Sequence, residues 1–184
     1  MLKVVFLLLL VPGARGETCL SRVAAQISGL RPSFPRLDGL ELVLETFESD
    51  EDFYRARPRS AWRPPRERVY AVFLNTKVCA DPPSPDAERA ILAHELAHLD
   101  AYAGMGRGAL LTLGWEYLVR PEGKKVEAVE KAADDAAVAL GLAPGLAAYR
   151  EWLYPRVPTK TAARKRRLYR TPEELRSKFP KLPP

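Results

Sequence analysis

The chain has 184 residues, of which 47% are hydrophobic, 28% charged and 9% aromatic, and its formal net charge is +6. This apolar content is too high for an intrinsically disordered protein. The composition is instead typical of a globular protein with a packed core. We expect a single folded domain over residues 17–158, between a leader at 1–16 and a basic C-terminal tail at 159–184.

The first sixteen residues have the pattern of a secretory signal peptide. A positive Lys3 precedes an apolar run at residues 4–11, and the small residues Ala14 and Gly16 follow. The run is shorter than the roughly 20 residues of a membrane-spanning helix, and no later stretch could span a bilayer. We therefore expect cleavage after about Gly16 and export to a periplasmic or extracellular location.

Cys19 and Cys79 are the only two cysteines. An even pair in an exported chain predicts one disulfide bond. The alternative is two unpaired buried thiols. A disulfide would tie the start of the mature chain to the region just before the two histidines.

The first part of the chain predicts one helix and two strands. Helical spacing of apolar residues indicates a short helix at 18–28, and alternation of Leu with other residues indicates a strand at 40–47. Residues 68–78 are β-branched and aromatic, and we expect them to pair with the first strand. The arginine- and proline-rich stretch at 55–68 predicts a loop, interpreted as a solvated connection in preference to a flap or a partner-binding strap.

A long helix should begin after Ser84. Serine is a favoured N-cap, Pro85 suits the first helical position, and Asp86 places a negative charge in the first turn. Gly104 is a natural end for this helix. Residues 105–121 are apolar and contain glycine, so they could form a lid or a wall.

Two more helices are expected, at about 122–140 and about 144–154, before the basic tail, which contains the sequence RKRR at 164–167. Together these elements predict an α+β fold. Its sheet would be small, antiparallel or mixed, with two to four strands packed on the long helix and on the helix at 122–140.

The two histidines of the chain, His94 and His98, lie four residues apart on the long helix. Residues with this spacing share one helix face, so both imidazoles can bind one metal ion. Glu95 is rotated by about 100° from His94, which places it where a general base would stand. The pattern His-Glu-x-x-His is the zinc hydrolase motif. A helix with two incidental histidines is the less favoured interpretation, because the motif uses every histidine in the chain.

A catalytic zinc site needs three protein ligands and an open fourth position. No third histidine exists, and the cysteines are better used in a disulfide, so we expect a carboxylate. Glu127, Glu130 and Asp134 share one face of the helix at 122–140. Spacing alone leaves both Glu127 and Glu130 as candidates.

With these residues the sequence resembles the gluzincin peptidases, whose third zinc ligand is a glutamate on a later helix. It is similar in particular to the soluble core of the HtpX and CAAX-prenyl peptidase group and to the small minigluzincins. Residues 130–134, Glu-Lys-Ala-Ala-Asp, match the Glu-x-x-Ala-Asp motif of their second helix. The resemblance covers roughly residues 68–141. It implies that Glu130 binds zinc and that Asp134 orients a histidine through its other ring nitrogen.

The resemblance also implies a function: a zinc-dependent endopeptidase with one Zn²⁺ per chain, a protein or peptide substrate, and Glu95 as general base. In gluzincins an edge strand before the active helix aligns the extended substrate, and residues 68–76 are placed to do this. Family members commonly use a histidine or an arginine to stabilise the oxyanion that forms on the substrate carbonyl during the reaction. Since no histidine remains, Tyr149, Arg150 and Tyr154 are the candidates for this role.

A second hypothesis keeps the metal without the catalysis: an inactive exported zinc-binding scaffold or assembly factor associated with anionic envelope surfaces. Glu95 argues against it, because an inert protein has no chemical need for a carboxylate there. No nucleic-acid partner is expected, because the predicted leader and the lack of a recognisable nucleic-acid-binding motif argue against one. Arg164, Arg166 and Arg167 could instead attach the chain to an anionic membrane or wall polymer.

Overall fold

The computed structural model describes residues 14–177, and the predicted leader lies outside the described residues except for its last three positions. The helix expected at 18–28 is confirmed as part of α1, and the other expected helices are found close to their predicted bounds. The elements are α1 Ala14–Leu30, β1 Glu41–Phe47, β2 Tyr54–Pro58, β3 Val69–Asn75, α2 Lys77–Ala80, α3 Pro85–Ala103, α4 Arg107–Val119, α5 Lys124–Ala139, α6 Ala143–Leu153, α7 Thr159–Leu168 and α8 Pro172–Ser177.

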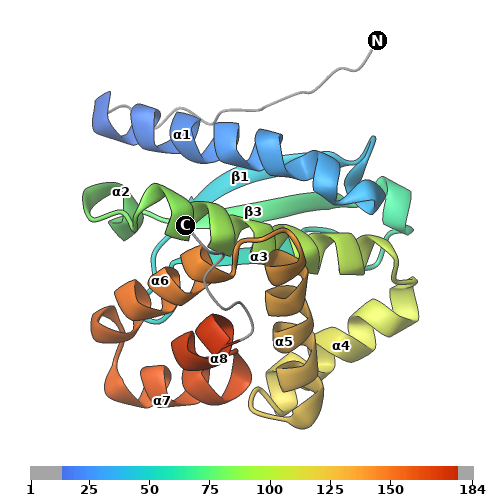
Figure 1. The fold of residues 1–184 in the computed structure, drawn as a ribbon. Helices are drawn as coiled ribbons and strands as arrows, with labels where there is room; N and C mark the ends of the chain where they lie inside the picture. The colour runs from blue at the N-terminus through green and yellow to red at the C-terminus, as the bar shows by residue number, and fades with distance from the viewer. Residues whose placement is uncertain (1–13, 178–184) are drawn as a thin grey trace.

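The sheet has three strands in the order β1-β3-β2, which confirms the predicted α+β fold with a small mixed sheet. β1 pairs with β3, as expected for the two predicted strands, and this pairing is parallel. β2 pairs with β3 antiparallel. In Figure 1 the sheet lies between α1 and the helices α5 and α6, with α3 running across the middle of the molecule.

The prediction of a loop over residues 55–68 is wrong at its start, because β2 occupies Tyr54–Pro58. Its side chains alternate between the two faces of the sheet. Arg55 and Arg57 lie on one face, where their guanidinium groups stack 4.6 Å and 4.7 Å from the ring centroids of Phe47 and Phe73. Pro58 is tolerated because β2 is an edge strand, where a residue without an N–H group need not remove a hydrogen bond between strands.

β3 is the central strand of the sheet, so residues 68–76 do not form the edge strand that was expected to align a substrate. Its main-chain groups are used in pairing with β1 and β2. The edge strand that lines the cavity described below is β2.

α3 is the element on which the fold is organised, since it contacts the sheet and the helices α1, α5 and α6. It begins as predicted: the Ser84 side chain accepts a hydrogen bond from the amide of Ala87, and Pro85 occupies the first turn. Gly145 lets α6 approach α3 closely. A Cβ atom at Gly145 would lie only 2.4 Å from the carbonyl oxygen of Asp86.

The predicted basic tail is folded through Ser177. Residues Thr159–Leu168 and Pro172–Ser177 form α7 and α8, which pack on α5 and α6, respectively. Thr161, Lys165 and Leu168 make a buried stripe along α7. Because Lys165 lies in that stripe, the sequence of α7 does not show the usual amphipathic pattern of a helix. The sequence therefore predicts a tail instead.

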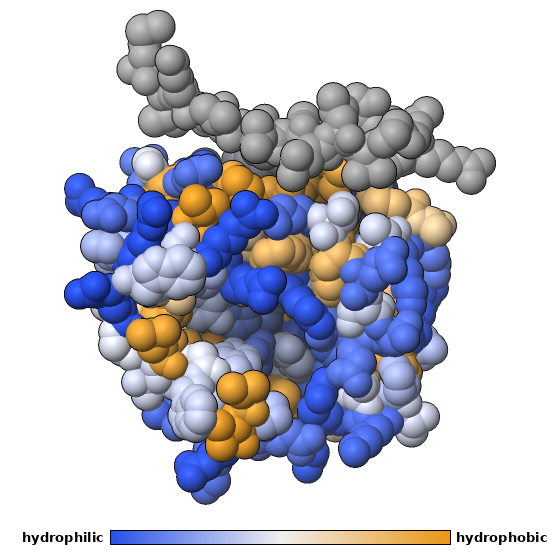
Figure 2. Space-filling view, turned by 180° about the vertical axis from the view of Figure 1, so that it is seen from behind, coloured by the Kyte–Doolittle hydropathy of each residue, from blue (hydrophilic) through white to orange (hydrophobic). Residues whose placement is uncertain are grey.

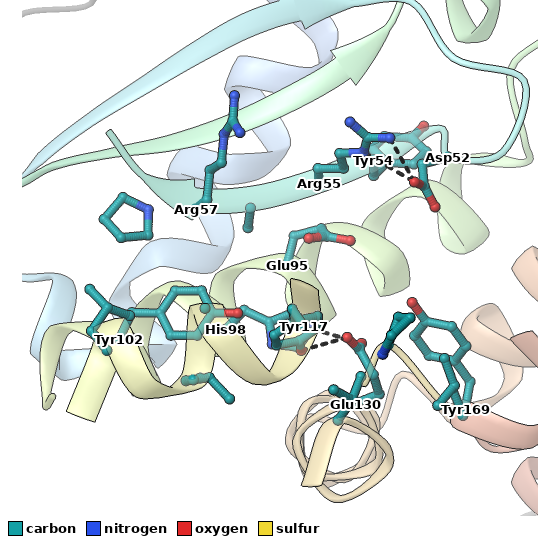
Figure 3. Close-up of a pocket in the computed structure, with 18 of the residues that line it drawn as sticks. Asp52, Tyr54, Arg55, Arg57, Glu95, His98, Tyr102, Tyr117, Glu130 and Tyr169 are labelled. Atoms are coloured by element: carbon teal, nitrogen blue, oxygen red, sulfur yellow. Dashed lines mark hydrogen bonds and ion pairs between the residues drawn. The ribbon is translucent and has the colours of Figure 1, made fainter. Parts of the chain in front are cut away.

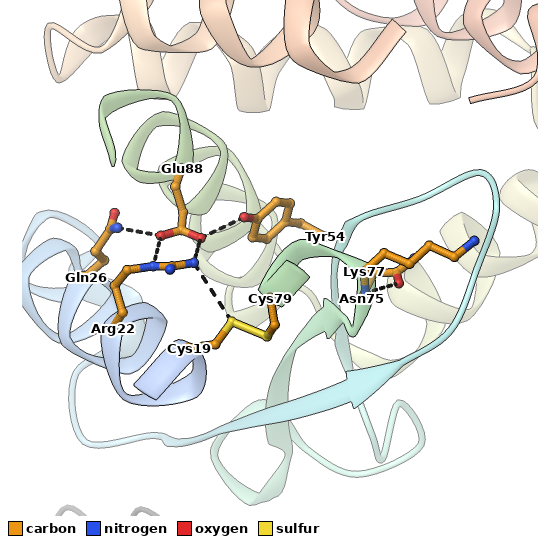
Figure 4. Close-up of a disulfide and its surroundings, with 8 residues drawn as sticks. All are labelled: Cys19, Arg22, Gln26, Tyr54, Asn75, Lys77, Cys79 and Glu88. Atoms are coloured by element: carbon orange, nitrogen blue, oxygen red, sulfur yellow. Dashed lines mark hydrogen bonds and ion pairs between the residues drawn. A yellow bond between two sulfur atoms is a disulfide. The ribbon is translucent and has the colours of Figure 1, made fainter. Parts of the chain in front are cut away.

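The predicted disulfide between Cys19 and Cys79 is confirmed, with the two Cα atoms 5.5 Å apart. It joins α1 to α2, just after the central strand (Figure 4). Beside it, the buried Glu88 of α3 accepts hydrogen bonds from Arg22, Gln26 and Tyr54. These contacts fasten α1 to α3. Among residues 14–177, no helix combines the length and the apolar character needed to cross a bilayer.

Candidate metal centre

Three side chains from two helices bring one donor atom each to a common point. His94 and His98 project from α3 and Glu130 projects from α5, and all three side chains are buried. Nε2 of His98 lies 3.1 Å from both Nε2 of His94 and Oε2 of Glu130, and the remaining separation, from His94 to Glu130, is 3.4 Å. A tetrahedron with metal–donor bonds of about 2.0–2.1 Å has edges of about 3.3–3.4 Å. The group could therefore hold a metal ion.

Glu127, the rival candidate for the third ligand, is not part of this group. Its carboxylate lies 2.6 Å from Lys131 Nζ, one turn further along α5. The side chain of Glu130 is turned toward α3 instead. The geometry thus favours Glu130.

Asp134 holds His94 in place, as the motif implied. Its Oδ1 lies 2.8 Å from His94 Nδ1 and also accepts a hydrogen bond of 2.8 Å from Arg150, while Oδ2 accepts one from the amide of Arg170. Burial alone would raise the pKa of Asp134, but the charge of Arg150 and the bond to His94 outweigh it and lower the pKa. A carboxylate at Nδ1 leaves Nε2 of His94 free for a metal ion.

Two tyrosines that the sequence did not single out support the other two donors. The Tyr117 hydroxyl donates a hydrogen bond of 2.7 Å to Oε1 of Glu130, so that Oε2 remains directed at the histidines. The ring of Tyr102 stacks on the ring of His98, with the centroids 5.9 Å apart. Each donor is therefore held by a second side chain.

Charge and hydrogen bonds link the side chains of the centre. Burial would lower the pKa of His94, but hydrogen bonds to Asp134 and Glu130 raise it to about 9. Electrostatic interactions and hydrogen bonds with His98 and His94 in turn hold the pKa of Glu130 well below its usual range, against the effect of burial. A metal ion would replace the proton in this cluster, as expected for ligands that must be deprotonated to bind.

Glu95 differs from the other acids of the centre because it has no hydrogen bond or ion pair within residues 14–177. Its side chain is buried and lines the cavity next to the donors. Burial raises the pKa of its carboxyl, although the nearby histidines oppose the rise. In Figure 3 the carboxylate lies between β2 and the Glu130 side chain.

The cavity has a volume of about 550 Å³ and opens on the face of the molecule shown in Figure 2, which is hollowed at its centre. β2 forms one wall, α4 a second and α7 a third. The α4 wall is apolar, whereas the other two carry arginines and Lys165 together with the acid Asp52, which pairs with Arg55 and Lys165. The residues that line it from α4 are Leu110, Leu113, Gly114 and Tyr117.

The three residues expected to steady an oxyanion do not line this cavity. Arg150 is used in holding Asp134, Tyr149 is packed between Tyr54 and Trp152, and Tyr154 lies under the guanidinium of Arg166. The structure places Tyr169 at the cavity instead.

Tyr169 follows α7, and its ring lies 5.7 Å from that of His94. The guanidinium of Arg150 stacks on the same ring at 4.3 Å. Burial raises the pKa of Tyr169 well above its usual value, so the hydroxyl stays protonated. No local sequence signal points to this residue, because its place depends on how α7 packs.

The arginines expected to attach the chain to an anionic surface have partners within the fold. Arg164 lies 2.9 Å from Glu51, Arg167 pairs with Glu122, and Arg166 covers the ring of Tyr154. They fasten α7 to its neighbours, and their role at a surface stays a prediction.

Comparison with known proteins returned no match from protein-family models, curated proteins or solved structures. A function must therefore be inferred from the residues and geometry of the centre itself.

Proposed function

We propose that the protein is a zinc-dependent endopeptidase. The observation that carries the proposal is the position of Glu95: a buried carboxylate without a partner among the described residues, next to three converging donor atoms, at the wall of a cavity that reaches the surface.

The donor set fits zinc. Two imidazole nitrogens and one carboxylate oxygen are a known ligand set of catalytic zinc, and they leave a fourth position open. Hard cations such as Mg²⁺ prefer oxygen ligands throughout. A bound zinc ion would supply Lewis acidity, which activates water and polarises a peptide carbonyl. His94, His98 and Glu130 would hold it.

Glu95 would act as general base and then as general acid. It would accept a proton from the water that attacks the scissile carbonyl and deliver that proton to the nitrogen of the leaving amine. Its missing hydrogen bonds support this role, because a carboxylate that is already saturated by donors is a poor base.

Tyr169 would stabilise the oxyanion that forms on the carbonyl. Its hydroxyl makes no hydrogen bond within residues 14–177, and its side chain lines the cavity. A protonated hydroxyl can donate to an oxygen that gains negative charge in the transition state. This assigns to Tyr169 the role that was expected of Tyr149, Arg150 or Tyr154.

β2 would align the substrate, in place of the strand predicted for this role. The amide of Arg59 donates to Val69, and the carbonyl of Phe53 accepts from Asn75. Because main-chain groups alternate in direction along an antiparallel strand, those of Tyr54 and Ala56 face the open edge. An extended peptide could add there as a further strand.

The disulfide is compatible with an oxidising compartment, and we propose that the enzyme works after export. The predicted leader that would direct this export falls on residues that are, for the most part, outside the described part of the chain.

The test is cleavage of casein by the purified protein, before and after removal of metal with a chelator. We expect activity that is lost on chelation and restored by zinc. The Glu95→Gln variant should bind zinc as the parent does and cleave nothing. Cleavage that persists in this variant would overturn the mechanism, and a parent protein that binds zinc without cleaving any peptide would favour the inactive scaffold.

A further inference from the structure

The outer face of α4 is apolar and exposed. Leu111, Trp115 and Val119 follow one another at spacings of four residues and Leu118 lies three residues after Trp115, so the four share one side of the helix. Their exposed fractions are 55%, 63%, 74% and 50%. Leu110 and Leu113, on the inner side, are buried at the cavity wall.

A surface helix of a globular protein normally turns its apolar face to the core and a polar face to water. α4 presents apolar side chains on both sides, and no other described residue covers the outer one. Figure 2 shows apolar side chains over α4 along the rim of the hollow. A contiguous apolar patch of this kind marks a surface that meets a partner.

Trp62, in the loop after β2, is a further exposed apolar side chain, with an exposed fraction of 65%. Its neighbour Ala61 lines the same cavity as the inner face of α4. The buried Arg68 holds this loop in place, because it donates to the carbonyl oxygens of Arg63, Tyr102 and Met105. Tyr102 and Met105 lie immediately before α4, so the loop is fixed beside the start of that helix.

Five exposed basic side chains lie at both ends of α4, at the start of α5 and in the loop that carries Trp62. None of them forms an ion pair within residues 14–177. Of the acids beside α4, Glu116 pairs with Lys125 and Glu122 pairs with Arg167, so neither neutralises them. One exposed acid, Glu67, lies next to Arg66 in the loop. The exposed basic residues are Arg63, Arg66, Arg107, Arg120 and Lys124.

We infer that this surface, the outer face of α4 with Trp62 and its basic rim, docks on an anionic lipid bilayer. Leucine and tryptophan on one side of a helix with lysine and arginine around them are the features of a helix that lies in the membrane interface. The basic rim would meet lipid phosphates while the apolar residues enter the acyl boundary. A second copy of the chain fits less well, because it would bring two positive rims together.

Docking in this way would place the cavity beside the bilayer, since α4 forms one of its walls. The inference concerns binding alone and does not depend on peptidase activity. A failure of one is therefore distinguishable from a failure of the other.

The test uses Trp115 as the reporter in the full chain, with Trp62→Phe and Trp152→Phe to remove the other two tryptophans. We expect its emission to shift to the blue and to be quenched by brominated acyl chains in vesicles of mixed phosphatidylcholine and phosphatidylglycerol. The response should weaken at high salt and on pure phosphatidylcholine. Binding through another part of the chain would leave Trp115 unchanged.

The variant Leu111→Glu/Leu118→Glu should bind these vesicles at least about tenfold more weakly, because two apolar side chains no longer enter the lipid. Leu140→Glu, at an exposed apolar residue after α5, is the matched control and should bind like the parent. An unresponsive Trp115, or a leucine variant that binds like the control, overturns the inference. Emission that shifts with protein concentration without lipid also overturns it, since a second copy then covers α4.

Discussion

Two glutamates on α3, Glu88 and Glu95, are both buried but have opposite environments. The carboxylate of Glu88 accepts two hydrogen bonds from Arg22, at 2.8 and 2.9 Å, and one each from Gln26 and Tyr54, at 2.8 and 2.9 Å. Glu95, two turns further along, has no such partner within residues 14–177 and faces the cavity.

The difference separates a structural acid from the one that we propose is reactive. Buried carboxylates are normally saturated by donors, because an unsatisfied one costs free energy of folding. Glu88 follows this rule and connects α1, β2 and α3. Glu95 departs from it beside a group that could hold a metal ion, and a departure of this kind is expected at a functional site.

The largest effect on stability is expected when the disulfide bond beside the Glu88 cluster is removed. Cys19 lies next to Arg22, and its bond to Cys79 closes a loop across a sequence separation of 60 residues. Replacing both cysteines by serine should lower the free energy of unfolding by about 4 kcal/mol, as the loop-entropy relation gives for this length. Urea unfolding measures this, and reduction of the parent protein should give a similar loss. No loss in either experiment would contradict the assignment.

Removal of the Glu88 charge tests the structural half of the comparison. Glu88→Gln should lower the free energy of unfolding by about 1–3 kcal/mol, because buried hydrogen bonds are lost. The ion pair adds little to this, since Arg22 is partly exposed to solvent. Zinc content per folded molecule should not change. A variant that keeps its stability but loses the metal would reverse the roles given to the two acids.

Tyr117→Phe removes the hydrogen bond that turns Glu130 toward the histidines. We expect a fall in zinc affinity of about 10–100-fold, the usual effect of losing a group that orients a ligand. Competition with a chromophoric chelator measures the affinity. Tyr70→Phe is the matched control, because its hydroxyl bonds to the carbonyl of Pro65, away from the centre. Equal affinities in the two variants would refute the role of Tyr117.

The smallest effect is expected on the stability of the metal-free Glu95→Gln variant. Because Glu95 makes no hydrogen bond to lose, the free energy of unfolding should stay within about 1 kcal/mol of the parent or rise. Urea unfolding of the two metal-free proteins, with Glu88→Gln beside them, measures the contrast. A loss as large as that of Glu88→Gln would show that Glu95 has a structural partner.

Local sequence patterns were enough to predict the parts of the site that one element provides. Ser84 and Pro85 mark the start of α3, and the spacing of His94 and His98 places both on one face of it. The third donor, Glu130, needed a motif from a resemblance, because spacing alone did not separate it from Glu127.

The rest depended on contacts that local patterns do not contain. The alternation in β2 was hidden by Arg55, Arg57 and Pro58, which are typical of loops. The buried stripe of α7 was hidden by Lys165, whose ammonium group is compensated by Asp52, more than a hundred residues away. Tyr169 lies at the cavity only because α7 packs there. The residues next to it in the sequence therefore could not have identified it.

The measurement that tests the account most directly is the metal content of the purified protein and of two matched variants, Glu130→Gln and Glu127→Gln. We predict one zinc ion per chain in the parent and in Glu127→Gln, and a loss of zinc in Glu130→Gln with the fold retained. Full zinc content in Glu130→Gln, or loss of zinc in Glu127→Gln alone, would contradict the ligand set from which the proposed function follows.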